Sequence, residues 1–232
     1  METADSLDAQ VRRGDPDRWL ASRFIADEAA RADVLAIYAL DLELARVPRV
    51  VHEPMMAEIR LTWWREAIAD LFAGKPARGQ PVLIALAEAI RRRNLASGPF
   101  EAMVEARFSD VDPEPFADDA ALQAYADGVA GAPLALALAV LGQADSVPLR
   151  PAALASVLAG LKPDLKRWPA GVALDRGLEA LDQARAAARR LPVHAFPAIA
   201  HLSLAGPRLK GRSPGPLEAR ARLTLAVLTG RI

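Results

Sequence analysis

The residues with the clearest capacity for chemistry fall in one expected helix, between residues 28 and 48. Asp41 lies three residues after Tyr38 and three before Leu44, on an apolar stripe of helical spacing. A carboxylate on such a stripe is costly to bury unless it is paired. Two interpretations follow: Asp41 lies at the edge of the stripe and pairs with an arginine, or it is a polar contact that lines a pocket.

Two further segments also have a chemical and a structural interpretation. Trp63 and Trp64 are adjacent, so they face different sides of a helix, and core packing is favoured over ligand stacking. Residues 110–119 hold five acidic side chains, a composition that suits Mg²⁺. The prolines in this stretch favour a solvated turn followed by a helix cap at Asp118.

The composition excludes several classes of function. The chain of 232 residues has no Cys and three scattered His, which removes disulfides, iron–sulfur clusters and Cys-based zinc sites. Lys and Arg together number 29, equal to Asp and Glu, so no net field attracts nucleic acid. There is no phosphate-binding loop, dinucleotide fingerprint, GxSxG elbow or HExxH pair.

These side chains must be positioned by helices. Ala and Leu are abundant, apolar residues recur at three and four residue intervals, and no run alternates like a strand. The pattern predicts an all-α fold, with a polar N-terminal segment over residues 1–14 and a single helical domain over residues 15–232. Pro48 should kink or end the helix that carries Asp41. A further helix is expected over residues 193–204.

The chain is expected to be cytoplasmic, with no transmembrane segment. The first ten residues are polar and acidic, unlike a secretory signal. The longest apolar stretch, Ala130–Leu141, has about twelve residues, whereas a membrane span needs ~20. Peripheral contact with the inner membrane stays open at this point.

Several blocks in combination resemble the squalene/phytoene synthase family. The likeness covers most of residues 15–143 and is weaker in residues 193–204 and 225–232. The blocks that carry it are Asp15–Leu20, Val34–Leu40, Glu43–Val47, Val51–Pro54, Glu58–Ala67, Pro113–Phe116, Tyr125–Gly131 and Val140–Gly142.

The resemblance implies an isoprenoid-synthase fold, somewhat truncated here because the chain is short for the family. Active members use two aspartate-rich motifs on facing helices to bind Mg²⁺ and prenyl diphosphates. In this sequence the aspartates of the first motif are missing at Ala45, Arg46 and Arg49. Arginines in these places would repel Mg²⁺ but could contact a phosphate.

The second motif is also eroded. Residues 152–174 contain one acidic residue, Asp164, while Asp175 and Glu179 have the motif's spacing outside its context. In this loss the chain resembles the branch formed by the mitochondrial complex I assembly factor with a squalene/phytoene synthase-like domain and its bacterial relatives. Blocks similar to that branch are Glu43–Ala45, Glu58–Trp64 and Val193–Ala198.

The resemblance therefore implies a catalytically degenerate protein. It would act as an assembly or scaffold factor for respiratory complex I, or as a prenyl-lipid binder. Its partners would be a respiratory-complex component or a prenyl lipid, and not nucleic acid. One alternative is an active transferase that condenses prenyl diphosphates, with Asp41, Glu43 and either Asp164 or Asp175 as displaced Mg²⁺ ligands. Another is a lipid-carrying or interaction module unrelated to respiration.

The candidate residues follow from these alternatives. Asp41 and Glu43 are the candidate catalytic residues. Tyr38, Arg46, Arg49 and Tyr125 are the candidate substrate-binding residues. No residue is predicted to bind a metal and no cofactor is expected, except Mg²⁺ if the protein is a transferase.

Overall fold

The computed structural model describes residues 2–51, 53–143, 149–160, 167 and 170–232. Within these ranges the chain forms helices and turns and no strand, which confirms the predicted all-α class. The N-terminal helices are α1 (Glu2–Gly14), α2 (Pro16–Ser22), α3 (Glu28–Val50), α4 (Pro54–Phe72), α5 (Pro81–Arg93) and α6 (Ser97–Phe108). The later elements are α7 (Asp119–Ala126), the π-helical turn η1 (Asp127–Gly131), α8 (Ala132–Val140), α9 (Leu149–Gly160), α10 (Ala170–Ala188), the 3₁₀ segments η2 (Val193–Ala198) and η3 (Ala200–Leu204), α11 (Ala205–Leu209) and α12 (Pro216–Thr229).

The N-terminal segment is part of the packed domain. Residues 2–14, expected as a polar segment outside it, form α1, which packs on α3 and α5. Leu7 and Val11 of α1 are buried in the same core as α3. Asp15 then caps α2, since its Oδ1 accepts a hydrogen bond from the Arg18 backbone N–H at 2.9 Å.

α3 is the central helix of the N-terminal half. Asp27 caps it by accepting from the Ala29 N–H at 3.0 Å. Its residues from Asp33 to Asp41 are buried without interruption, so this stretch contacts neighbours on every side. The helix continues two residues beyond Pro48, where we expected it to bend or end.

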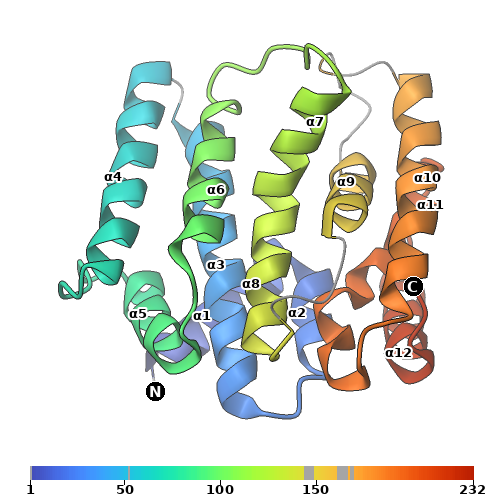
Figure 1. Cartoon of the computed structure of the whole chain (residues 1–232), viewed down its shortest axis with the longest axis horizontal. Helices are drawn as coiled ribbons and strands as arrows, with labels where there is room; N and C mark the ends of the chain where they lie inside the picture. Colours follow the sequence, from blue (N-terminus) through green and yellow to red (C-terminus); the bar gives the residue numbers. More distant parts are fainter. Residues whose placement is uncertain (1, 52, 144–148, 161–166, 168–169) are drawn as a thin grey trace.

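α7, η1 and α8 form one continuous helical run beside α3 and α6 (Figure 1). Asp118 caps this run as predicted, with Oδ1 accepting from the Ala121 N–H at 2.8 Å. Gly128 lies in the π turn, where a Cβ would come within 2.4 Å of the Ala106 Cβ and 2.8 Å of the Ala102 carbonyl oxygen. A glycine is therefore required for α6 to approach the turn.

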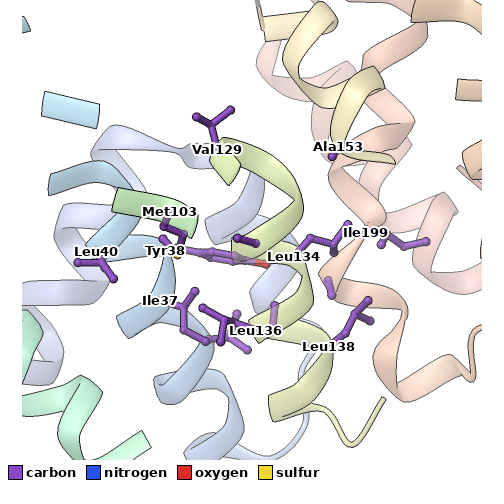
Figure 2. Close-up of a cluster of buried hydrophobic side chains, with 14 of the residues drawn as sticks. Ile37, Tyr38, Leu40, Met103, Val129, Leu134, Leu136, Leu138, Ala153 and Ile199 are labelled. Atoms are coloured by element: carbon purple, nitrogen blue, oxygen red, sulfur yellow. The ribbon is translucent and has the colours of Figure 1, made fainter. Parts of the chain in front are cut away.

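The same run, Asp119–Val140, is the one helix among the described residues with the length and apolar composition of a membrane span. Of the most apolar 18-residue window of this run, 61% is buried inside the domain. Burial of this extent is typical of a core helix, and Figure 2 shows Ile37 and Tyr38 of α3 pointing toward Leu134 and Leu136 of α8.

The C-terminal elements close the bundle on the side of α9 and α10. The expected helix over residues 193–204 is present as two 3₁₀ segments, η2 and η3, rather than an α-helix. Pro197 lies inside η2 and has no N–H to donate, which disfavours regular α-helical bonding there. α12 packs on α2 and η3, so the last helix of the chain contacts an element of its N-terminal half.

Candidate functional site

A cavity of about 500 Å³ lies between α2, α3, the η1–α8 run, α9 and the η3–α11 segment. α3 contributes Tyr38, Asp41, Ala45 and Arg49, whose spacing of three, four and four residues places them along one face of the helix. The opposite wall is mainly apolar. It is formed by residues that include Val129, Leu134, Val157 and Leu202.

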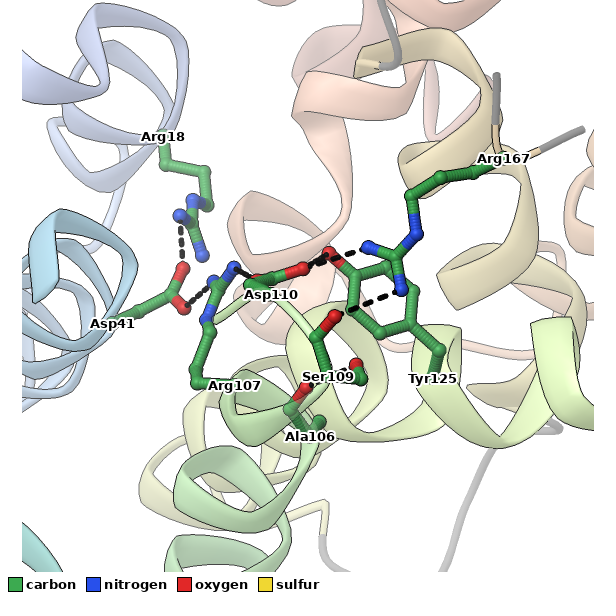
Figure 3. A network of polar contacts seen from close by, with 8 residues as sticks. All are labelled: Arg18, Asp41, Ala106, Arg107, Ser109, Asp110, Tyr125 and Arg167. Atoms are coloured by element: carbon green, nitrogen blue, oxygen red, sulfur yellow. Dashed lines mark hydrogen bonds and ion pairs between the residues drawn. The ribbon is translucent and has the colours of Figure 1, made fainter. Parts of the chain in front are cut away.

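Asp41 is buried at the inner end of this face, between two arginines (Figure 3). Its Oδ2 accepts a hydrogen bond from Arg18 Nη2 at 2.6 Å, and its Oδ1 accepts one from Arg107 Nη2 at 2.8 Å. Burial alone would raise the pKa of Asp41, but the two guanidiniums hold it below the ordinary value. Asp41 is therefore ionised, and each of its oxygens is already engaged by a cation.

Arg18 is held from three directions. Its Nε forms an ion pair with Asp15, its Nη2 bonds Asp41, and its guanidinium lies 4.7 Å from the centre of the Tyr38 ring. Burial raises the pKa of Tyr38 above its usual value, so the phenol stays neutral at physiological pH. The candidate substrate-binding residue Tyr38 thus supplies a cavity wall and a cation–π contact rather than an acid or a base.

The ion pairs continue away from the cavity along Arg107, Asp110 and Arg167 (Figure 3). Arg107 Nη1 donates to Asp110 Oδ2 at 3.2 Å, and Asp110 Oδ1 accepts from Arg167 Nη1 at 2.9 Å. Arg167 also donates to the Ser109 and Glu114 carbonyl oxygens, each at 3.1 Å. This arginine therefore ties the turn after α6 to the chain that precedes α10.

Tyr125 belongs to this network and does not line the cavity. Its hydroxyl donates to Asp110 Oδ1 at 2.9 Å, and the Arg167 guanidinium lies 5.0 Å from its ring centre. Burial, with the nearby Asp110 charge, raises the pKa of Tyr125 to about 12. Its position indicates a structural role for a residue that we expected to bind substrate.

The structure brings some of the candidate residues together and separates others. Tyr38, Asp41 and Arg49 line the cavity, whereas Glu43 and Arg46 line a separate groove between α3 and α4. Of the alternative metal ligands proposed with them, Asp175 is exposed on α10 and Asp164 lies outside the described residues.

Arg49 and His201 each bring to the cavity a polar group that has no partner among the described residues. Arg49 is exposed and makes no ion pair or hydrogen bond within that part of the chain. The buried Nδ1 of His201 also has no hydrogen-bond partner there. Burial and, next, the Arg18 charge lower the pKa of His201 to about 4, so the imidazole is neutral at physiological pH. Arg49 is therefore free to meet a ligand, whereas the Nδ1 of His201 is buried.

The residues around the cavity do not fit the Mg²⁺ site of a prenyl transferase. Mg²⁺ needs several carboxylate oxygens, but each carboxylate that lines the cavity is paired with an arginine: Asp41 with Arg18 and Arg107, Asp15 with Arg18, and Asp17 with Arg208. Ala45 and Arg49 occupy the motif positions on the cavity wall. Over the described ranges, no three His, Asp or Glu side chains are placed to hold a metal ion.

Sequence reasoning missed three members of the network: Arg18, Arg107 and Arg167. Arg18 had a local signal, because it follows the cap residue Asp15 at a spacing that allows a side-chain bond. Arg107 lies 66 residues from Asp41, and no sequence pattern relates the two positions.

The fold and the cavity together correspond to a known class of protein. A model of the squalene/phytoene synthase family matches residues 11–161, and the chain belongs to this family. The most similar structures include a dehydrosqualene synthase solved in complex with ligand, with a TM-score of 0.78 and 14% identity over 98% of this chain and 96% of that one. Another is squalene synthase HpnC from Alicyclobacillus acidocaldarius, with a TM-score of 0.67 and 18% identity over 99% and 94% of the two chains.

Among curated relatives, the chain is similar to the protein named NADH dehydrogenase (ubiquinone) complex I, assembly factor 6. Identity to the Homo sapiens protein is 30% over 128 residues, which are 55% of this chain and 38% of that protein. Identity to the Dictyostelium discoideum homolog is 26% over 129 residues, or 56% and 36%. The match therefore spans well under half the length of these relatives. The predicted family is confirmed, and so is the predicted similarity to this assembly factor.

Proposed function

We propose that this protein is a non-catalytic member of the squalene/phytoene synthase family that acts in the cytoplasm as an assembly factor for respiratory complex I. The observation that carries the proposal is the pairing of Asp41 with both Arg18 and Arg107. A carboxylate clamped in this way cannot also coordinate Mg²⁺ without breaking a buried ion pair, which is energetically costly.

The similarity to complex I assembly factor 6 supports the respiratory part of the proposal. The match to the family model, which runs from residue 11 to residue 161, includes α2 to α6. A protein that supports assembly needs surfaces and a stable fold, and does not need the metal-bound diphosphate chemistry of the transferases.

The cavity gives the protein room for a ligand as well. Its apolar wall and its volume of about 500 Å³ suit part of a prenyl chain, and Arg49 supplies a cation for an anionic head group. A bound prenyl lipid would serve as a structural or regulatory ligand. This part of the proposal is independent of the assembly role.

Deletion of the gene in its host tests the assembly role. We expect less fully assembled complex I on native gels and lower NADH oxidation in isolated membranes supplied with a short-chain quinone. The added quinone removes any dependence on quinone supply, and endogenous quinone content should be normal. Normal assembly of complex I would instead favour the transferase alternative. So would low endogenous quinone content together with a defect in NADH oxidation that the added quinone repairs.

A further inference from the structure

A second hollow lies on the outside of the bundle, between the end of α3 and the first half of α4. It is a groove of about 620 Å³ whose apolar lining comes from residues that include Val47, Val50, Met56, Ile59 and Trp63. Figure 1 places α4 at the edge of the bundle, where no described helix covers its outer face. The groove is separate from the cavity that contains Asp41.

Large apolar side chains are unusually concentrated here. Val50, Met56 and Ile59, all in the groove lining, are each between 48% and 55% exposed, and they fall within ten residues of sequence. Single exposed apolar residues are common on protein surfaces, but a contiguous group marks an interaction site. Their exposure indicates that this face is covered by another molecule.

α4 presents two apolar faces. Ala57, Leu61 and Trp64 are buried against the bundle, as expected for a surface helix. Met56, Ile59 and Trp63 repeat at the helical spacing of three and four residues along the groove. The Trp63 ring packs edge-on against Trp64, with ring centres 5.0 Å apart, so the outer apolar face rests on the core.

The charged groups of the groove favour an acidic partner. Arg46 and Arg60 line it, and neither makes an ion pair or hydrogen bond within the described part of the chain. The single carboxylate in the lining, Glu43, accepts a hydrogen bond from Gln10 Nε2 at 2.6 Å. The exposed Glu53, just before α4, and Glu58 of α4 do not line the groove. The groove lining therefore has two unpaired guanidiniums and one carboxylate, so the rim of the groove is positively charged.

The shape of the groove favours a helix over a lipid surface as its occupant. A concave groove is filled by a row of side chains, whereas a flat bilayer would leave it hydrated. From Met56 to Trp63 the groove extends seven residues along α4, or about 10 Å at 1.5 Å per residue, which matches two turns of a helix. Flexible methionines are common in surfaces that accept amphipathic helices.

We propose that the groove lined by Met56, Ile59 and Trp63 binds an amphipathic helix of a partner protein, with acidic residues beside its apolar face. The apolar side chains of that helix enter the groove, and its carboxylates meet Arg46 and Arg60. The proposal does not depend on what the cavity binds, or on whether the partner belongs to a respiratory complex.

A displayed library of 18-residue helical peptides tests the proposal. Each peptide carries varied Leu, Ile, Met or Phe at positions i, i+3, i+4 and i+7, flanked by Glu and Asp in one half of the library and by Lys and Arg in the other. We expect enrichment of the acidic half on the full-length protein. Met56→Glu and Ile59→Glu should each weaken an enriched peptide at least tenfold. Arg60→Glu should weaken acidic peptides and strengthen basic ones.

Matched controls come from α12, whose Leu225 and Leu228 are also exposed. Leu225→Glu and Leu228→Glu should leave peptide affinity unchanged, and circular dichroism should show that all variants are folded. Failure to enrich any helix, equal enrichment of basic helices, or binding that ignores the groove variants would overturn the proposal. Binding to phosphatidylglycerol vesicles that the groove variants abolish, without any enriched helix, would assign the face to the membrane.

Discussion

Arg107 Nη2 donates to Asp41 Oδ1 at 2.8 Å and thereby joins α6 to α3 across 66 residues of sequence. Because Arg18 of α2 holds the other oxygen, one buried carboxylate connects three helices. Removal of one member of such a cluster leaves charges buried without a partner. The network at the cavity is therefore important for stability.

Asp41→Ala should lower the free energy of unfolding by about 3–5 kcal/mol, because it leaves Arg18 and Arg107 without their shared carboxylate. Urea denaturation followed by circular dichroism measures the change. Glu105→Gln is the control, since this exposed carboxylate pairs with Arg65 only at 3.8 Å, and it should change stability by about 0.5 kcal/mol or less. A loss below about 1 kcal/mol for Asp41→Ala would contradict the role given to the cluster.

Stability should fall as the pH is lowered from about 6.5 to about 4, in part because of His201. The folded imidazole has a pKa of about 4, whereas in the unfolded chain it titrates near 6.5, so the unfolded state binds more protons between these values. Protonation of His201 should lower the free energy of unfolding by up to about 1.4 kcal/mol per pH unit in this range. His201→Gln should flatten this part of the profile.

His194→Gln, at an exposed histidine, controls for the loss of an imidazole as such. The measurement is the free energy of unfolding in denaturant at a series of pH values. An unchanged slope in His201→Gln would show that this histidine is protonated equally in both states.

Gly128→Ala should destabilise the protein by about 1–3 kcal/mol, the usual cost of overpacking. The new Cβ would lie 2.4 Å from the Ala106 Cβ and 2.8 Å from a backbone oxygen of α6, so α6 and the π turn must separate. Gly98→Ala is the matched control, because a Cβ there meets no atom within 4 Å. Thermal melting should show a lower midpoint for the first variant only, and similar midpoints for both would argue against the close approach.

Binding of a farnesyl thiodiphosphate probe should be independent of Mg²⁺. We expect calorimetric titration to give the same affinity with and without the metal, because the carboxylates that line the cavity are all paired with arginines. Arg49→Ala should weaken binding about tenfold through loss of a charged hydrogen-bond donor. Arg46→Ala, three residues away but in the other groove, should have no effect.

Binding that requires Mg²⁺ and is lost in Asp41→Ala would favour the transferase alternative. That result would leave the helix-binding groove on α4 unaffected, because the two hollows share no lining residue.

Local signals predicted the helices well and the site only in part. Asp118 marked a helix start that the structure confirms, because capping depends on adjacent residues. The spacing around Asp41 indicated a carboxylate that is either paired or lines a pocket, and both are true. Which arginines pair with it depends on how helices pack, which spacing within one helix does not specify.

The two arginines at the end of α3 illustrate the same point. Arg46 and Arg49 were grouped as one substrate-binding pair, but α3 is a wall shared by the cavity and the groove, and Arg49 lines the first while Arg46 lines the second. Likewise, the periodicity of residues 193–204 predicted a helix correctly. It did not distinguish the 3₁₀ form, which depends on Pro197 and on packing.

The π-helical turn at residues 127–131 sets the rotational phase of the helix that follows it. A π turn takes in about one residue more than an α turn, and one residue corresponds to roughly 100° around the axis. Without that extra residue, α8 would be rotated by this angle, and Leu134 would leave the cavity wall. The width of the cavity thus depends on the number of residues in one turn, and a single deletion there would reshape it more than most substitutions in its lining.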